Sequence, residues 1–169
     1  MAANAVTLRL FRDEDVYEDF EVENMVAMES VVLKNFIDTY TDTGMEPLRF
    51  PILYGNIKSR KVLEMVLDHC KFHAHAKSNT ISEEDVKIWD TQFVERALSA
   101  DKNQATFCHI LLAANFLEIR DLFDLLCKAS ADFLEHKSVE EMRQMLKIEN
   151  DFSEEEEEAI MRQTERAYA

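Results

Sequence analysis

The stretch that decides the fold is QATFCHILLAANFLEIRDLFDLLCKASADFL, residues 104–134. Apolar residues recur in it at helical spacing, which predicts successive helices at 104–117 and 119–134. The second helix carries one broad apolar face, formed by Ile119, Leu122, Phe123, Leu126 and Phe133. The stretch has no glycine or proline, and the whole chain of 169 residues holds only 2 of each. Such a composition favours helices and argues against a turn-rich all-β fold.

Strands are predicted only toward the N-terminus. Residues 6–11 and 17–22 predict two short strands joined by a charged turn. Residues 48–53 contain Pro51 and predict an edge strand or an extended connector. Further helices are predicted at 24–40, 57–73 and 89–98, with a polar loop at about 76–88. The fold class that follows is α+β.

Two more helices are predicted near the C-terminus. Ser138 with Glu141, and Ser153 with Glu156, match the capping box, in which the two side chains satisfy free amides of a helix start. The acidic run at 154–158 fits a solvated first turn, which the helix dipole favours, better than a calcium site.

Charge and composition exclude several functions. The net charge of −15 disfavours nucleic acid and anionic membrane surfaces as partners. No apolar run reaches membrane-spanning length. Two glycines, at 44 and 55, cannot supply a phosphate-binding loop. The three cysteines indicate reduced structural thiols of the cytosol or nucleus rather than a disulfide framework.

Candidate catalytic and metal-binding residues are few. His69 and His73 lie four apart, but zinc needs three or four converging ligands and no further ligand pair is evident. We therefore expect no metal or other cofactor, and we expect both histidines at a helix edge. Cys108 and His109 are adjacent in a predicted helix and point about 100° apart, so they form no catalytic dyad. The chain is not expected to be an enzyme.

The C-terminal segment carries more apolar side chains than short helices bury among themselves. Docking of a partner on these residues is favoured over self-packing, and both readings stay open. They are Met142, Leu146, Ile148, Phe152, Ile160 and Met161.

Three motifs together resemble one family. They are Trp89-Asp90-x-x-Phe93, ILLAANFLEI at 110–119 and LKIENDFSEEE at 146–156. The chain resembles the S-phase-kinase-associated protein family, the adaptor subunits of SCF ubiquitin ligases, and is most similar to plant members.

The resemblance implies a BTB/POZ domain at 5–134, a small sheet flanked by helices, and a helical extension at 135–169 that binds the F-box motif. It further implies a non-enzymatic adaptor of the nucleus and cytoplasm, which bridges a cullin to F-box substrate receptors for ubiquitin-dependent degradation.

The resemblance also implies site residues. Asn115 and Phe116 match a family Asn-Tyr pair at the cullin interface, although an asparagine tolerated in a left-handed helix terminus is the alternative. Arg166 stands where the family has a tryptophan. The F-box residues that it implies are Met142, Leu146, Ile148, Asn150, Asp151, Phe152, Ile160 and Arg166.

Two other functions stay open. One is a divergent scaffold that binds F-box proteins without a cullin and acts outside ubiquitination. The other is a metal-dependent hydrolase built on His69, Cys70 and His73, which would need bound zinc.

Overall fold

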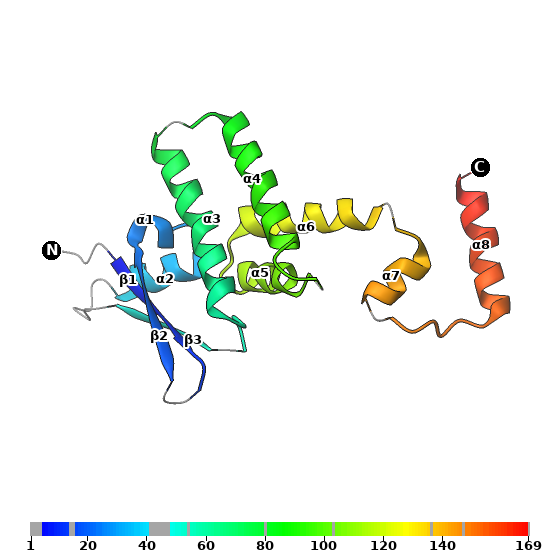
Figure 1. Ribbon diagram of the computed structural model, residues 1–169, viewed down its shortest axis with the longest axis horizontal. Helices are drawn as coiled ribbons and strands as arrows, with labels where there is room; N and C mark the ends of the chain where they lie inside the picture. The colour runs from blue at the N-terminus through cyan, green and yellow to red at the C-terminus, as the bar shows by residue number, and fades with distance from the viewer. Residues whose placement is uncertain are drawn as a thin grey trace. The chain divides into compact units, whose positions relative to one another are not determined.

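The computed structural model describes residues 5–13, 16–40, 48–53, 55–79, 81–102, 104–135, 137–146 and 148–168, without the side chains of 145, 146, 165, 167 and 168. The three strands occur in its first third, with α1 and α2 between the second and third strands, and helices follow β3 (Figure 1). The elements are β1 (Ala5–Phe11), β2 (Tyr17–Glu23), α1 (Asn24–Ala27), α2 (Val31–Tyr40), β3 (Arg49–Leu53), α3 (Arg60–Asn79), α4 (Glu83–Leu98), α5 (Ala105–Phe116), α6 (Arg120–Glu135), α7 (Val139–Leu146) and α8 (Glu154–Tyr168). The predicted α+β class is confirmed.

The three strands form one sheet in the order β2-β1-β3. β1 pairs antiparallel with β2, so that Val6 lies opposite Val22, and it pairs parallel with β3. Leu8 and Leu10 of β1 are fully buried together with Val6, because alternate side chains of a strand share one face. β3 lies at an edge of the sheet, where Pro51 is tolerated although it has no amide hydrogen to donate. The strand predictions are therefore confirmed, and 48–53 contains an edge strand.

The single helix predicted at 24–40 is wrong, because the chain forms two helices there, on either side of Ser30. The buried Ser30 hydroxyl accepts a hydrogen bond from the Leu33 amide (3.1 Å), as a helix N-cap does. It also donates to the Leu117 carbonyl (2.5 Å). One serine thus starts α2 and fastens it to the end of α5.

The polar loop predicted at 76–88 is also wrong, since α3 continues to Asn79 and α4 begins at Glu83. The Ser82 side chain caps α4 by accepting a hydrogen bond from the Asp85 amide (3.1 Å). Acidic side chains fill the first turn of α4, where the helix dipole favours negative charge. The segment is polar because its helical turns are exposed to water.

The hydrophobic core joins the sheet to α3, α4, α5 and α6. Full burial of one such side chain stabilises a fold by about 1.5–3 kcal/mol. The largest fully buried apolar side chains include Leu8, Leu10, Leu33, Ile52, Leu63, Phe93, Ile110, Leu122 and Leu126.

The three cysteines are all free thiols. Only Cys70 is buried, and burial raises the pKa of its thiol to about 12, which leaves it protonated and inert at neutral pH. Cys108 and Cys127 are exposed, so the expectation of structural thiols fits Cys70 alone.

The chain divides into two compact units, Met1–Ala129 and Ser130–Ala169. The division falls within α6, five residues before the end of the domain expected at 5–134. The first unit contains the sheet and the core, and the second contains α7 and α8. Across the described part of the chain, no helix has the length and apolarity needed to span a membrane.

Candidate functional site

The first candidate site is the corner between α5 and α6. Its backbone reverses at Glu118, which adopts a left-handed φ of 50°. The last turn of α5 is closed by hydrogen bonds from the Ile119 amide to the Ala114 carbonyl (2.9 Å) and from the Glu118 amide to the Asn115 carbonyl (3.2 Å). A left-handed residue with these reverse hydrogen bonds is a common helix end, but a non-glycine residue there is uncommon.

Asn115 and Phe116 differ in their exposure to solvent at this corner. Asn115 is exposed in the last turn of α5 and is helical. The left-handed residue is Glu118, so Asn115 is not explained as a tolerated left-handed terminus. Phe116 is half-buried and packs against the core. Of the two predicted contact residues, Asn115 is thus presented to solvent, whereas Phe116 also supports the fold.

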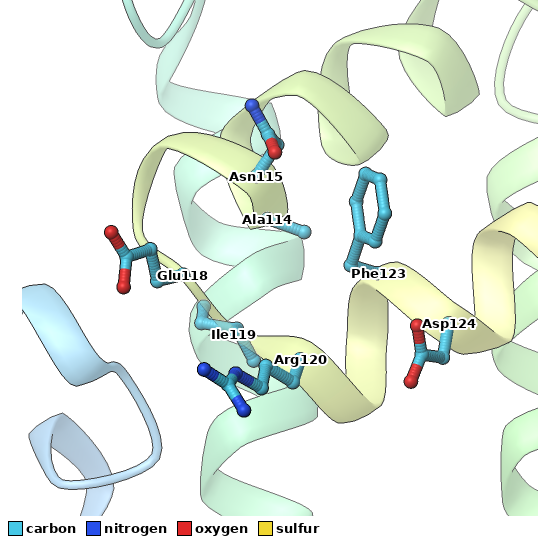
Figure 2. Close-up of a pocket in the computed structure, with 7 residues that line it drawn as sticks. All are labelled: Ala114, Asn115, Glu118, Ile119, Arg120, Phe123 and Asp124. Carbon is cyan, nitrogen blue, oxygen red and sulfur yellow. The ribbon is translucent and has the colours of Figure 1, made fainter.

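A shallow pocket adjoins Asn115, and Phe116 is not part of its lining (Figure 2). In Figure 2 the Phe123 ring of α6 stands beside Ala114 of α5, with charged groups around them. Sequence reasoning missed Phe123 as a site residue because its helical spacing indicated a core position. The pocket is lined by Ala114, Asn115, Glu118, Ile119, Arg120, Phe123 and Asp124.

The second candidate site is formed by α7 and α8, whose starts are the predicted capping boxes. The Ser138 amide donates to Glu141 Oε2 (2.8 Å), and the Glu141 amide donates to Ser138 Oγ (3.2 Å). Ser153 and Glu156 exchange the same bonds at 2.9 and 3.4 Å. The hydrogen bond from the serine amide holds the pKa of each glutamate below its usual range. Both predicted helix starts are confirmed.

An apolar groove lies between the two helices. Its apolar lining is exposed, including Phe152, which is 49% exposed. Contiguous exposed apolar side chains with a polar rim are typical of protein-docking surfaces. The groove is lined by Val139, Glu140, Arg143, Phe152, Glu157, Ile160 and Met161.

A polar network connects both helices to the segment between them. Arg143 of α7 forms an ion pair with Glu157 of α8 at 3.2 Å. Asn150 donates a hydrogen bond from Nδ2 to the same oxygen, Glu157 Oε1 (2.8 Å). Sequence reasoning missed the ion pair because its partners lie 14 residues apart in different helices.

The structure brings together only some of the predicted F-box residues. Phe152 and Ile160 share the apolar groove, whereas Ile148 and Asn150 line a second groove with Arg143 and Glu157. Three other predicted residues line neither groove: Met142, which is half-buried, and the exposed Asp151 and Arg166. Leu146 ends α7, and its side chain lies outside the described residues.

The α7–α8 unit has no core of its own among its described side chains. None of them from residue 130 onward is buried, although Val139, Ile148, Phe152, Ile160 and Met161 are all large and apolar. Self-packing of these residues, the alternative to docking, therefore leaves between 45% and 67% of each of these side chains exposed to water.

His69 and His73 stack on α3 with ring centroids 4.1 Å apart. The expectation that both lie at a helix edge is wrong for His69, which is 2% exposed. Burial lowers the pKa of His69 to about 3, with the charges of His73 and Lys77 adding to the effect. His69 is therefore neutral at pH 7, and its 3.8 Å approach to Asp90 is not an ion pair.

Comparison with known protein families finds two matching models. Residues 14–75 match the POZ-type tetramerisation domain of the Skp1 family, and residues 120–167 match the dimerisation domain of the same family. The first match covers β2 and β3 but not β1, and the second covers α6, α7 and α8. The α5–α6 corner therefore adjoins a matched segment, and the α7–α8 site lies within one.

Similar proteins are found in plants. The chain is 37% identical to SKP1-like protein 11 of Arabidopsis thaliana, over 89% of this chain and 91% of that protein. It is 38% identical to SKP1-like protein 10 of Arabidopsis thaliana, over 86% and 88%. It is 37% identical to SKP1-like protein 1 of Oryza sativa, over 89% and 90%.

Proposed function

The chain belongs to the Skp1 family, and we propose that it is a non-enzymatic adaptor of an SCF-type ubiquitin ligase. In this function the α7–α8 unit holds the F-box motif of a substrate receptor, and the α5–α6 corner contacts a cullin. The bound receptor then presents its substrate for ubiquitination and degradation.

One observation carries the F-box half of the proposal: the α7–α8 unit exposes a continuous apolar groove and buries none of its described side chains. An amphipathic helix of a partner binds such a groove by laying its apolar face against it. Phe152 and Ile160 supply apolar surface for that contact, and the Arg143–Glu157 pair supplies a polar rim. Binding would give these side chains the burial that their own unit lacks.

The cullin half of the proposal rests on the α5–α6 corner. Asn115 is exposed beside a pocket with an apolar wall, Phe123, and a charged rim that includes Arg120 and Asp124. The hydrogen bond that the Ser30 hydroxyl donates to the Leu117 carbonyl ties this corner to the start of α2. A fixed surface of this kind binds a rigid scaffold without first losing much conformational entropy.

The adaptor acts through proximity. Linking a substrate receptor to a scaffold raises the effective concentration of the substrate at the transferring enzyme, and the adaptor itself makes or breaks no bond. The proposal places the protein in the nucleus and cytoplasm, where thiols stay reduced, in keeping with its three free cysteines.

Affinity purification of the tagged full-length chain from plant cells, followed by identification of co-purifying proteins, tests the proposal. We expect a cullin and several F-box proteins in the same eluate. Recovery of F-box proteins without a cullin would instead support the alternative function, a scaffold that binds F-box proteins and acts outside ubiquitination. Recovery of neither would contradict it.

A further inference from the structure

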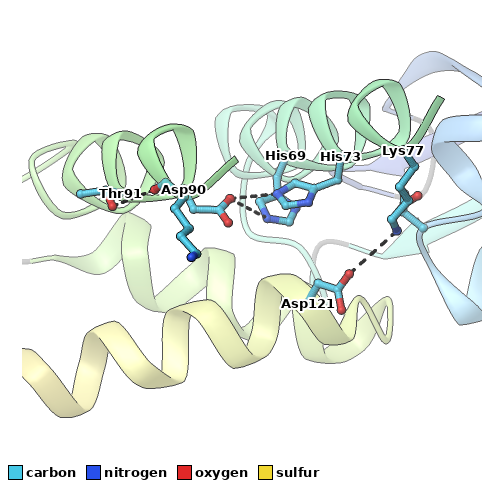
Figure 3. A network of polar contacts seen from close by, with 8 residues as sticks. His69, His73, Lys77, Asp90, Thr91 and Asp121 are labelled. Carbon is cyan, nitrogen blue, oxygen red and sulfur yellow. Dashed lines mark hydrogen bonds and ion pairs between the residues drawn. The ribbon is translucent and has the colours of Figure 1, made fainter. Parts of the chain in front are cut away.

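A cluster of three metal-ligating side chains lies between α3 and α4, on the first unit and in neither candidate site. His73 Nε2 lies 2.8 Å from Asp90 Oδ1, and His69 Nε2 lies 3.8 Å from the same oxygen. One possible ligand atom of each residue falls within 4.8 Å of the other two. Figure 3 shows both imidazoles turned toward the Asp90 carboxylate.

Helix geometry brings the two imidazoles together. Residues four apart lie on one face of a helix, so His69 and His73 project from successive turns of α3 toward α4. The same spacing of two histidines on a helix serves zinc enzymes, where both bind one metal ion. Asp90 comes from α4, 17 residues beyond His73.

Aromatic rings hold the cluster rigid. Phe93 contacts the His69 ring edge-on, with centroids 5.3 Å apart, and Trp89 lies 5.7 Å from it. Phe72 stacks on Trp89 at 4.2 Å. Side chains fixed in this way present their donor atoms with little loss of entropy on binding.

The buried His69 ring is the feature that hydrogen bonding leaves unexplained. Among the described residues, neither Nδ1 nor Nε2 of His69 has a hydrogen-bond partner, although the residue is 98% buried. A buried polar atom without a partner costs stability and calls for an explanation. The hydrogen bond between His73 and Asp90 accounts for those two residues but not for His69.

We propose that His69, His73 and Asp90 bind a divalent first-row transition-metal ion, with Zn²⁺ as the representative case. Two imidazole nitrogens and one carboxylate oxygen form a common zinc ligand set, with water in the fourth position. Tetrahedral zinc with bonds of about 2.0–2.1 Å holds its ligand atoms about 3.3 Å apart. The 2.8 and 3.8 Å distances lie on either side of that separation, and the three ligand atoms all lie within 4.8 Å of one another.

The cluster is open to solvent on one side. His73 lines an open groove between the two helices together with Lys77 and Lys87, and this groove gives an ion access from solvent. The nearby Lys77 ammonium is occupied by Glu29, at 2.6 Å, and lies 3.9 Å from Asp121. Cys70 is not a member of the cluster, so the ligands differ from those of the hydrolase considered from the sequence. A bound ion would link α3 to α4.

Zinc titration of the full-length chain, stripped of metal with a chelator, tests the proposal by isothermal calorimetry and by thermal melting. We expect one equivalent of Zn²⁺ to bind and to raise the melting temperature. Asp90→Asn and His73→Gln should each weaken zinc binding more than about tenfold, since even outer-shell changes cost about that much. His75→Gln removes an imidazole from the same helix outside the cluster and should bind zinc as the wild type does.

Failure of the wild-type chain to bind one equivalent of Zn²⁺ would overturn the proposal. Unchanged zinc affinity in both Asp90→Asn and His73→Gln would also overturn it, because the ion would then be bound by other residues, such as exposed acidic side chains. Circular dichroism checks that each variant is folded, and His73→Gln, at a partly exposed position, decides the matter if Asp90→Asn does not fold.

Discussion

Arg143 of α7 and Glu157 of α8 form an ion pair at 3.2 Å, and the Glu157 oxygen in that pair also accepts a hydrogen bond from Asn150. This shared oxygen connects two helices and the segment between them, in a unit that buries no described side chain. The groove proposed to hold the F-box thus depends on one carboxylate for its shape.

Replacement of that carboxylate should loosen the groove. Glu157→Gln removes the charge that Arg143 pairs with, and we expect F-box affinity to fall a few-fold. The melting temperature should barely change, because a partly exposed ion pair contributes about 1 kcal/mol or less. Glu158→Gln is the matched control, since Glu158 pairs with Arg162 within α8 alone. Equal effects of the two changes on F-box affinity would count against this role of Glu157.

Phe152 should act as an anchor for the F-box. It is half-exposed in the groove, so Phe152→Ala removes little packing from the folded chain but a large ring from the interface. We expect F-box binding to weaken by about 2 kcal/mol or more, roughly thirtyfold. Leu53→Ala, at an exposed apolar residue of β3, is the control and should leave binding unchanged. Affinity and melting temperature measured on the same samples separate binding from folding, and unchanged affinity would remove Phe152 from the site.

Asn115 gives the clean test of the cullin contact. Asn115→Lys places a charge in the interface while the exposed position keeps the fold intact, so we expect cullin binding to be lost and F-box binding to persist. Gln92→Lys adds the same charge on the exposed face of α4 as a control.

Phe116→Ala is less informative alone, because the half-buried ring also packs on the core and its loss should lower the stability. Persistence of cullin binding in folded Asn115→Lys would show that the contact lies elsewhere.

Acid should destabilise helices α7 and α8, because it protonates the glutamates that cap their first turns. The folded pKa values of Glu141 and Glu156 lie below the ordinary value of 4.5, so their capping contribution is present above that pH and is lost as the pH falls through the folded values. Circular dichroism should show helix content falling with acid in the wild type. The double variant Glu141→Gln, Glu156→Gln keeps the capping hydrogen bonds without a titrating group and should lose less helix over the same range. Identical acid curves would contradict this.

Local patterns were enough to predict much of the fold. The strand pair follows from short apolar runs around a charged turn, and both capping boxes follow from a serine three residues before a glutamate. The break at Ser30 could not be predicted in this way, because the bond that fixes it goes to Leu117, 87 residues away.

The sites were only partly predictable for the same reason. Phe152 and Ile160 share a groove, and both belong to the apolar set that the short C-terminal helices were expected to leave unburied. The resemblance implied Phe116 as a cullin contact, but its burial depends on neighbours in the core that no local pattern shows. Asp90 completes the histidine cluster from another helix, and no local motif marks it as a ligand.

Reconstitution from purified components tests the central claim most directly. An F-box protein is immobilised, a cullin N-terminal domain is added, and the retained cullin is measured with and without this chain. The adaptor function predicts that cullin is retained only when the chain is present, and that Asn115→Lys abolishes retention while the chain itself stays bound. Cullin retained equally without the chain, or not retained when the chain is bound, would contradict it.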